Sequence, residues 1–198
     1  MNALKPKSLS YRTCLVLAAM FTGLTAYELY SGWTIGGPQF DAIVTSGYAA
    51  VVALALSLFV SPIVHTSKRM NVKLPLPYFM AFRRSLGLLA TWFAAVHLAV
   101  VTGTYLHGKW GALTENVFLS SGLLTFALLL LLSLSSFPSL CKRLKIKMWK
   151  ELHMLVYACG VFAAFHLSLG SFSPDWVLLL NIIILPFLLV MRLSLRNL

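Results

Sequence analysis

The sequence predicts an all-α integral membrane protein with six transmembrane helices and both termini on the cytoplasmic side. Three observations support this prediction: the composition, six long apolar runs, and the distribution of basic residues. Of the 198 residues, 59% are hydrophobic and only 11% are charged, whereas soluble domains carry about 25% charged residues. The mean hydropathy is +0.84. A soluble fold of this size cannot bury so much apolar surface, so we expect a single membrane domain over residues 1–198.

Six apolar runs approach or exceed the roughly 18 residues that a helix needs to cross the hydrocarbon core of a bilayer. They cover residues 13–30, 42–64, 85–105, 117–137, 149–169 and 176–191. The first run follows basic residues, as a signal peptide does, but Glu28 lies within it and no small-residue cleavage site follows. We therefore expect an uncleaved first helix. The last run is the shortest and contains Pro186, where we expect a kink.

The basic residues determine the predicted orientation. Fifteen of the sixteen lie before the first run, in the second or fourth connection, or after the last run, and only Lys109 lies on the opposite side. Because basic loops stay in the cytoplasm, both termini are predicted to be cytoplasmic. The net charge of +11 does not indicate nucleic-acid binding, since the basic residues flank apolar runs instead of forming a patch on a polar fold.

The connections are too short to hold a separate catalytic domain. Pro75 and Pro77 are expected to keep the second connection extended. We find no internal repeat, phosphate-binding loop, dinucleotide-binding glycine motif or nucleophile elbow. The three cysteines have no C-x-x-C spacing and are interpreted as packing residues: Cys14, Cys141 and Cys159.

Two histidines are predicted to lie at the same depth in the outer half of the membrane. His97 follows Arg84 by thirteen residues, about 20 Å of helix, and His166 follows Lys150 by sixteen. An ionisable group inside a span is costly unless it is paired or functional. Two imidazoles at one depth can hold a flat ligand such as haem between two helices. A zinc site would need a third ligand that the sequence does not supply at that depth, and each histidine can also be a hydrogen-bonded packing residue.

His153 is predicted near the cytoplasmic end of the fifth run, thirteen residues before His166. That spacing places it about 20 Å lower and about 140° around the helix. His65, at the cytoplasmic end of the second run, is a candidate partner for it by depth alone. We interpret His65 otherwise as interfacial and His107 as a loop residue.

Two segments carry a resemblance to a known family. The first is RRSLGL at 83–88, followed by Trp92 and His97, and the second is RLKIKMWKELHMLVY at 143–157, followed by His166. Together with Ser61-Pro62 and the basic loop after it, these segments resemble the ferric reductase-like transmembrane family over about residues 46–169. Within that family they are similar to the MsrQ (YedZ) branch, the haem-binding membrane subunits of bacterial methionine sulfoxide reductase systems.

The resemblance implies a six-helix cytochrome b-like bundle in the inner membrane of a bacterium, which passes electrons through haem b. It implies that His97 and His166 are axial ligands and that His153 serves a second haem or the point where electrons enter. Larger relatives carry two histidines on each of two helices, and this chain has Arg84 where the inner histidine of the third span is expected. We therefore expect one haem, while a second haem and FMN stay open.

Haem also needs an apolar slot and cations for its propionates. Trp92, Phe93 and Phe165 are candidate walls of that slot, with core packing as the alternative. Arg83 and Arg84 are candidate sites at the cytoplasmic rim for an anionic flavin or lipid phosphate, with a purely topological role as the alternative.

The function expected from the resemblance is electron transfer by the membrane subunit of an oxidoreductase. The donor would be a cytoplasmic flavin/NAD(P)H reductase or quinol, because the chain has no flavin or nicotinamide domain of its own. The acceptor would be a periplasmic partner such as a molybdenum-containing methionine sulfoxide reductase of the MsrP type. The alternatives are direct reduction of ferric chelates at the outer surface and, in a different class, a non-redox transporter or scaffold.

Overall fold

The protein crosses the membrane several times with helices. The computed structural model describes residues 16, 18–20, 22–27, 38–72, 75–137, 140 and 146–170, among which there is no strand. Three helical stretches are long and apolar enough to span a membrane: Asp41–Ser67, Pro77–Tyr105 and Val117–Ser135. They contain or nearly coincide with three predicted runs, and Leu155–Leu169 is a shorter apolar helix. The run 176–191 lies outside the described residues, so the number of six helices and the orientation of the termini stay predictions.

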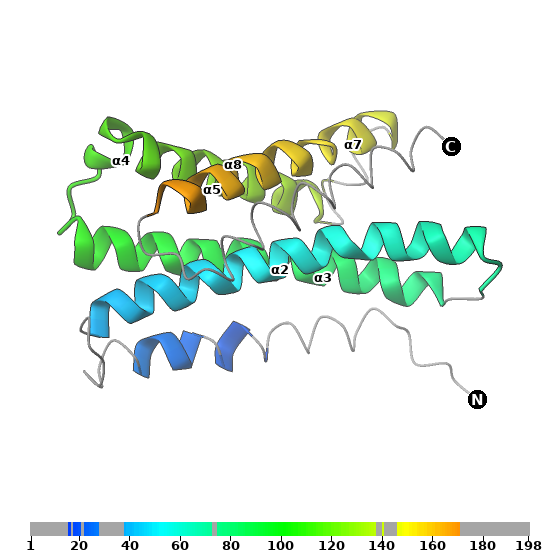
Figure 1. The fold of residues 1–198 in the computed structure, drawn as a ribbon, viewed down its shortest axis with the longest axis horizontal. Helices are drawn as coiled ribbons and strands as arrows, with labels where there is room; N and C mark the ends of the chain where they lie inside the picture. The colour runs from blue at the N-terminus through cyan, green and yellow to red at the C-terminus, as the bar shows by residue number, and fades with distance from the viewer. Residues whose placement is uncertain are drawn as a thin grey trace.

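The first hairpin consists of α2 (Pro38–Arg69) and α3 (Leu76–Val100), which lie antiparallel along their whole length (Figure 1). A five-residue π-helix, η1 (Val101–Tyr105), continues directly from the end of α3. Pro75 and Pro77 do not extend the connection as expected. They begin α3 instead, because the first-turn N–H groups of a helix have no intrahelical partner and proline lacks only that group.

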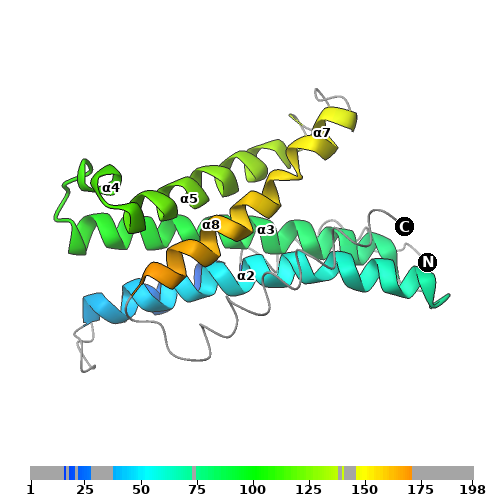
Figure 2. The same ribbon diagram turned by 45° about the horizontal axis from the view of Figure 1, so that its top comes forward.

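The second hairpin consists of α5 (Val117–Ser135) and α8 (Leu155–Leu169), which pack across the first hairpin (Figure 2). The short helix α4 (Ala112–Glu115) connects η1 to α5. α5 begins where the Asn116 side chain accepts a hydrogen bond of 2.8 Å from the Phe118 N–H, a typical N-cap. The starts of α2 and α5 lie at the same end of the bundle as α4, which we call the α4 end (Figure 1).

The predicted continuous run 149–169 is interrupted in the structure. α7 (Ile146–Leu152) ends at a turn formed by His153 and Met154, and α8 follows. The Met154 N–H bonds to the carbonyl of Glu151 and the Tyr157 N–H to that of Met154, both at 3.0 Å. These i→i−3 bonds tighten the chain locally and separate the two helices. The opposite end of the bundle, which contains α7, is called the α7 end.

The core lies where the two hairpins cross. Ala90 on α3 and Cys159 on α8 have no exposed surface, and such small side chains let helices approach closely in a membrane. Thr91 on α3 donates to the carbonyl of Leu129 on α5 at 3.3 Å, and its hydroxyl lies 2.5 Å from that of Ser133. Cys159 is free and buried, as predicted for a packing residue.

Candidate functional site

An apolar pocket of about 340 Å³ lies between the two hairpins. This volume falls at the lower end of the range of ligand pockets, about 300–1,000 Å³. The side chains that line it come from α2, α3, η1, α5 and α8 and from Leu113 of α4. None of these lining residues carries a carboxylate, an ammonium or a guanidinium group. The polar side chains in the lining are His97, His166, Tyr48, Tyr105 and Thr125.

His97 of α3 and His166 of α8 meet in this pocket. Their ring centroids are 6.4 Å apart and the ring planes are inclined by 80°. A metal ion bound by two imidazole nitrogens at about 2 Å each, with each ring centre about 1 Å further out, separates the ring centres by about 6 Å. The pair is therefore spaced as two axial ligands of one metal would be.

Each of these histidines is oriented by a backbone carbonyl from the neighbouring helix. Nδ1 of His97 lies 2.9 Å from the carbonyl oxygen of Ile43 on α2, and Nδ1 of His166 lies 2.8 Å from that of Phe118 on α5. Because a carbonyl only accepts hydrogen bonds, Nδ1 carries the proton in both rings. Nε2 therefore keeps its lone pair, which is the state of a metal-binding histidine with an oriented second nitrogen.

One serine and one glycine lie beside each of the two histidine rings. The Ser46 hydroxyl lies 3.3 Å from Nδ1 of His97, and the Ser121 hydroxyl lies 3.5 Å from Nδ1 of His166. Each serine is followed by a glycine whose α-carbon faces the same imidazole ring, Gly47 or Gly122. Sequence reasoning did not identify these four residues, although a Ser-Gly pair inside an apolar run is a recognisable signal.

The two hairpins line the pocket with equivalent positions. Lining positions on α5 follow those on α2 by 75 residues, and lining positions on α8 follow those on α3 by 69. The pairs are Ile43/Phe118, Val44/Leu119, Gly47/Gly122, Tyr48/Leu123, Ala50/Thr125, Val51/Phe126, Leu54/Leu129, Ala94/Ala163, His97/His166 and Leu98/Leu167. The sequence F-A-A-x-H-L occurs at both 93–98 and 162–167. The expectation of no internal repeat is therefore wrong for the residues around the pocket.

The structure places the aromatic residues expected to wall the slot elsewhere. Trp92 is half-exposed, and its indole N–H donates to the Thr22 hydroxyl of the first span at 3.1 Å. It precedes His97 by five residues, which is about 140° around the helix. Phe93 lies in the core, and Phe165 is exposed. The aromatic side chains that do line the pocket are Tyr48, Tyr105, Phe118 and Phe126.

His153 lies apart from this pocket, at the α7 end. Its ring packs on Trp149 with centroids 4.1 Å apart, and its Nε2 lies 3.3 Å from the Ser136 hydroxyl. Arg84 donates to the carbonyl of the same Ser136. The residues predicted from the sequence thus separate into two groups, with His97 and His166 in the pocket and His153 beside Ser136 and Arg84.

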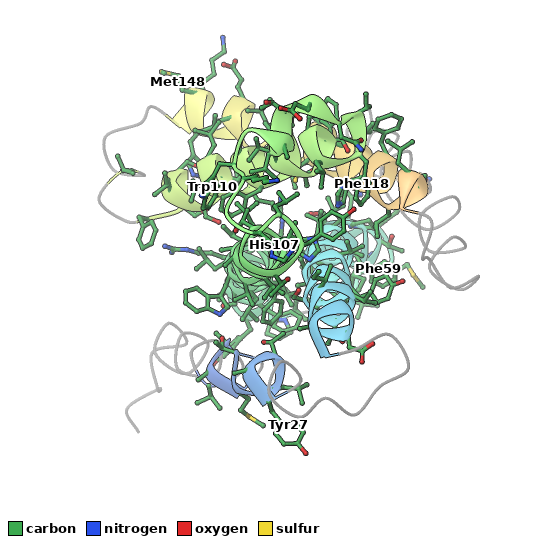
Figure 3. The ribbon with its side chains drawn as sticks, turned by 90° about the vertical axis from the view of Figure 1, so that its left-hand side faces the viewer. Tyr27, Phe59, His107, Trp110, Phe118 and Met148 are labelled. Atoms are coloured by element: carbon green, nitrogen blue, oxygen red, sulfur yellow. The ribbon has the colours of Figure 1, made fainter. Side chains whose placement is uncertain are left out.

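The remaining predicted residues lie outside the pocket lining. Arg83 is half-buried on α3, and the hydroxyl of Ser57 donates to its carbonyl at 3.3 Å. His65 lies near the end of α2, and no hydrogen-bond partner for its Nδ1 is found among the described residues. His107 lies in the turn between η1 and α4, as predicted for a loop residue (Figure 3). The described part of the chain contains no cluster of three metal-binding side chains, which leaves the zinc alternative without a third ligand there.

Comparison with known proteins identifies the family. The model of the family described as "Ferric reductase like transmembrane component" matches residues 46–164. The chain belongs to this family. The matched residues of the ferric reductase-like domain begin at Ser46 and end two residues before His166, so they include both hairpins almost completely.

Relatives within the family share one description, "Protein-methionine-sulfoxide reductase heme-binding subunit MsrQ". The chain is 31% identical to the protein of Deinococcus radiodurans over 175 residues, covering 85% of this chain and 81% of the relative. It is 31% identical to the protein of Xanthomonas axonopodis pv. citri over 153 residues, covering 72% and 66%. It is 36% identical to the protein of Xanthomonas campestris pv. campestris strain 8004 over 89 residues, covering 43% and 40%. These matches agree with the resemblance seen in the sequence.

Proposed function

We propose that the chain binds haem b in the pocket, with His97 and His166 as axial ligands, and acts as a membrane electron-transfer subunit. One observation carries the proposal: two imidazoles from different helices face each other at 6.4 Å, each with Nδ1 on a carbonyl of its neighbour. The relatives are described as heme-binding subunits, which supports the same ligand.

The residues of the pocket suit this ligand in three ways. The Nε2 atoms of His97 and His166 have free lone pairs for an axial metal. The lining is almost entirely apolar, which excludes water and matches a flat hydrophobic ring. The described residues of the lining hold no cation for the haem propionates, and the hydroxyls of Tyr48, Tyr105 and Thr125 are the polar groups available to the edge of the ring. Haem supplies one-electron chemistry when it is bound.

We further propose that electrons enter at the α7 end and leave at the α4 end. Basic residues at the α7 end support a cytoplasmic location under the positive-inside rule, among them Arg69, Arg83, Arg84 and Lys147. The donor is a cytoplasmic flavin reductase or a quinol, with Arg83, Arg84 and His153 near its contact point. The acceptor is a periplasmic methionine sulfoxide reductase of the molybdenum-containing type, in keeping with the name of the relatives.

The first test is spectroscopic. The purified protein is expected to show b-type absorbance in reduced-minus-oxidised spectra, and His97→Ala and His166→Ala are each expected to lose most of it. His107→Ala is the matched control, because this histidine lies in an exposed turn. Absence of b-type absorbance in the parent protein, or full haem content in both alanine variants, would overturn the proposal. A pyridine haemochrome measurement of haem per polypeptide decides between one haem and two.

The second test concerns the partner. A strain that lacks the gene is expected to lose repair of oxidised periplasmic methionine and to keep reduction of ferric chelates at its surface. Loss of ferric-chelate reduction with intact methionine repair would instead identify a ferric reductase.

A further inference from the structure

Two of the three glycines that line the pocket, Gly47 and Gly122, lie in close contact with the ligand histidines. A Cβ atom added to Gly122 would lie 2.7 Å from Cε1 and 2.9 Å from Nδ1 of His166. A Cβ atom added to Gly47 would lie 3.1 Å from Cε1 and 3.2 Å from Nδ1 of His97. Ordinary carbon contacts lie at about 3.5–4.0 Å. Each imidazole ring therefore occupies the space that the Cβ atom of any residue other than glycine would need at that position. The contact on α5 is the tighter of the two.

The serine before each glycine shares the carbonyl that orients the histidine. The Ser121 hydroxyl donates to the Phe118 carbonyl at 2.7 Å, and Nδ1–H of His166 donates to the same oxygen at 2.8 Å. On α2 the Ser46 hydroxyl lies 3.0 Å from the Ile43 carbonyl but only 2.6 Å from that of Ala42. A carbonyl oxygen that receives a second donor has less electron density for the first. Ser121 therefore weakens the hydrogen bond from His166 to the Phe118 carbonyl more than Ser46 weakens the hydrogen bond from His97 to the Ile43 carbonyl.

We propose that the Ser-Gly pairs at 46–47 and 121–122 are positioning residues for the two axial histidines. Each glycine determines how closely the imidazole approaches the helix that carries the glycine. Each serine determines how strong the hydrogen bond is between Nδ1–H and the backbone carbonyl of that helix. The α5 pair has the larger influence, because its glycine lies closer to the imidazole ring and its serine lies closer to the carbonyl oxygen that it shares with the histidine. This inference rests on the proposed haem site, since it assigns roles around the same two ligands.

The expected effects follow from these contacts. Changes to the groups that orient a metal ligand typically reduce metal affinity by about 10- to 100-fold. Gly122→Ala displaces the His166 ring and is expected to weaken haem binding by about tenfold or more, and Gly47→Ala by less. Gly103→Ala is the matched control, because a Cβ there meets nothing within 4 Å and the residue does not line the pocket. Ser121→Ala is expected to keep the haem and to strengthen the hydrogen bond from Nδ1–H of His166 to the Phe118 carbonyl. The imidazole then becomes more electron-rich, which lowers the reduction potential of the haem.

The test uses the full-length protein in detergent, stripped of haem and titrated with hemin, followed by redox titration of the reloaded protein. The expected order of affinity is parent and Gly103→Ala, then Gly47→Ala, then Gly122→Ala, with a lower potential in Ser121→Ala than in Ser46→Ala. Equal affinity of Gly122→Ala and Gly103→Ala, or an unchanged potential in Ser121→Ala, overturns the inference. The serine variants add no atoms, so they test it even where Gly122→Ala does not fold. A parent protein that binds no hemin would instead overturn the proposed function.

Discussion

Replacing Phe118 by leucine removes an aromatic contact from His166 and leaves the hydrogen bond of that histidine in place. The Phe118 ring lies nearly parallel to the His166 ring, with centroids 4.3 Å apart and planes inclined by 8°. The oxygen that accepts from Nδ1 of His166 belongs to the Phe118 backbone, so the substitution does not remove it. The equivalent residue on α2 is Ile43, which offers its carbonyl to His97 but has no ring to stack.

The size of the effect follows from the stacked pair. Aromatic pairs contribute about 0.5–1.5 kcal/mol beyond the area that they bury. Because about 1.4 kcal/mol corresponds to a factor of ten in an equilibrium constant, Phe118→Leu is expected to weaken haem binding by roughly two- to tenfold. Ile43→Leu keeps the volume, the apolar character and the backbone acceptor, and is expected to change the affinity by less than this.

The assay is a hemin titration of the haem-free protein, with both variants and the parent compared in the same detergent. Far-ultraviolet circular dichroism checks that each variant keeps its helix content. The reasoning would be refuted by a parent-like dissociation constant in Phe118→Leu, or by an equal loss in Ile43→Leu. The second result would mean that side-chain shape on α2 and α5, and not the stacked ring, controls the position of the histidines.

Three further predictions concern the ring planes and the helix contacts. Ferric protein is expected to give a strongly anisotropic low-spin electron paramagnetic resonance signal, since the His97 and His166 rings are nearly perpendicular; a rhombic signal typical of parallel rings would contradict this geometry. Thr91→Val is expected to lower the free energy of unfolding in mixed micelles by about 1 kcal/mol through loss of the interhelical bonds. Thr102→Val, which removes bonds only to carbonyls of its own helix segment, should cost less. Trp92→Phe is expected to keep full haem content while lowering the melting temperature, and loss of haem would show that the indole supports the pocket after all.

Three of the membrane-spanning segments and the matched level of His97 and His166 could be predicted from the sequence alone. Hydropathy over about 20 residues is a local property of the sequence. The runs that it predicted at 42–64, 85–105 and 117–137 lie within, or nearly coincide with, the three long apolar helices of the structure. The fixed rise of an α-helix converts residue spacing into depth. For this reason the prediction that His97 and His166 lie at one level agrees with their meeting in the structure.

Only the tertiary structure decided which faces of the helices meet. The carbonyls of Ile43 and Phe118 and the glycines beside the rings come from helices far away in the chain from the histidines that they contact. The same packing directed Trp92 towards the first span and put the turn at His153 next to Ser136. Rotation about a helix axis depends on side-chain contacts between helices, which residue spacing within one helix does not contain. The sequence by itself therefore determined that two histidines share a depth, and the packing of the hairpins decided that they face each other across one pocket.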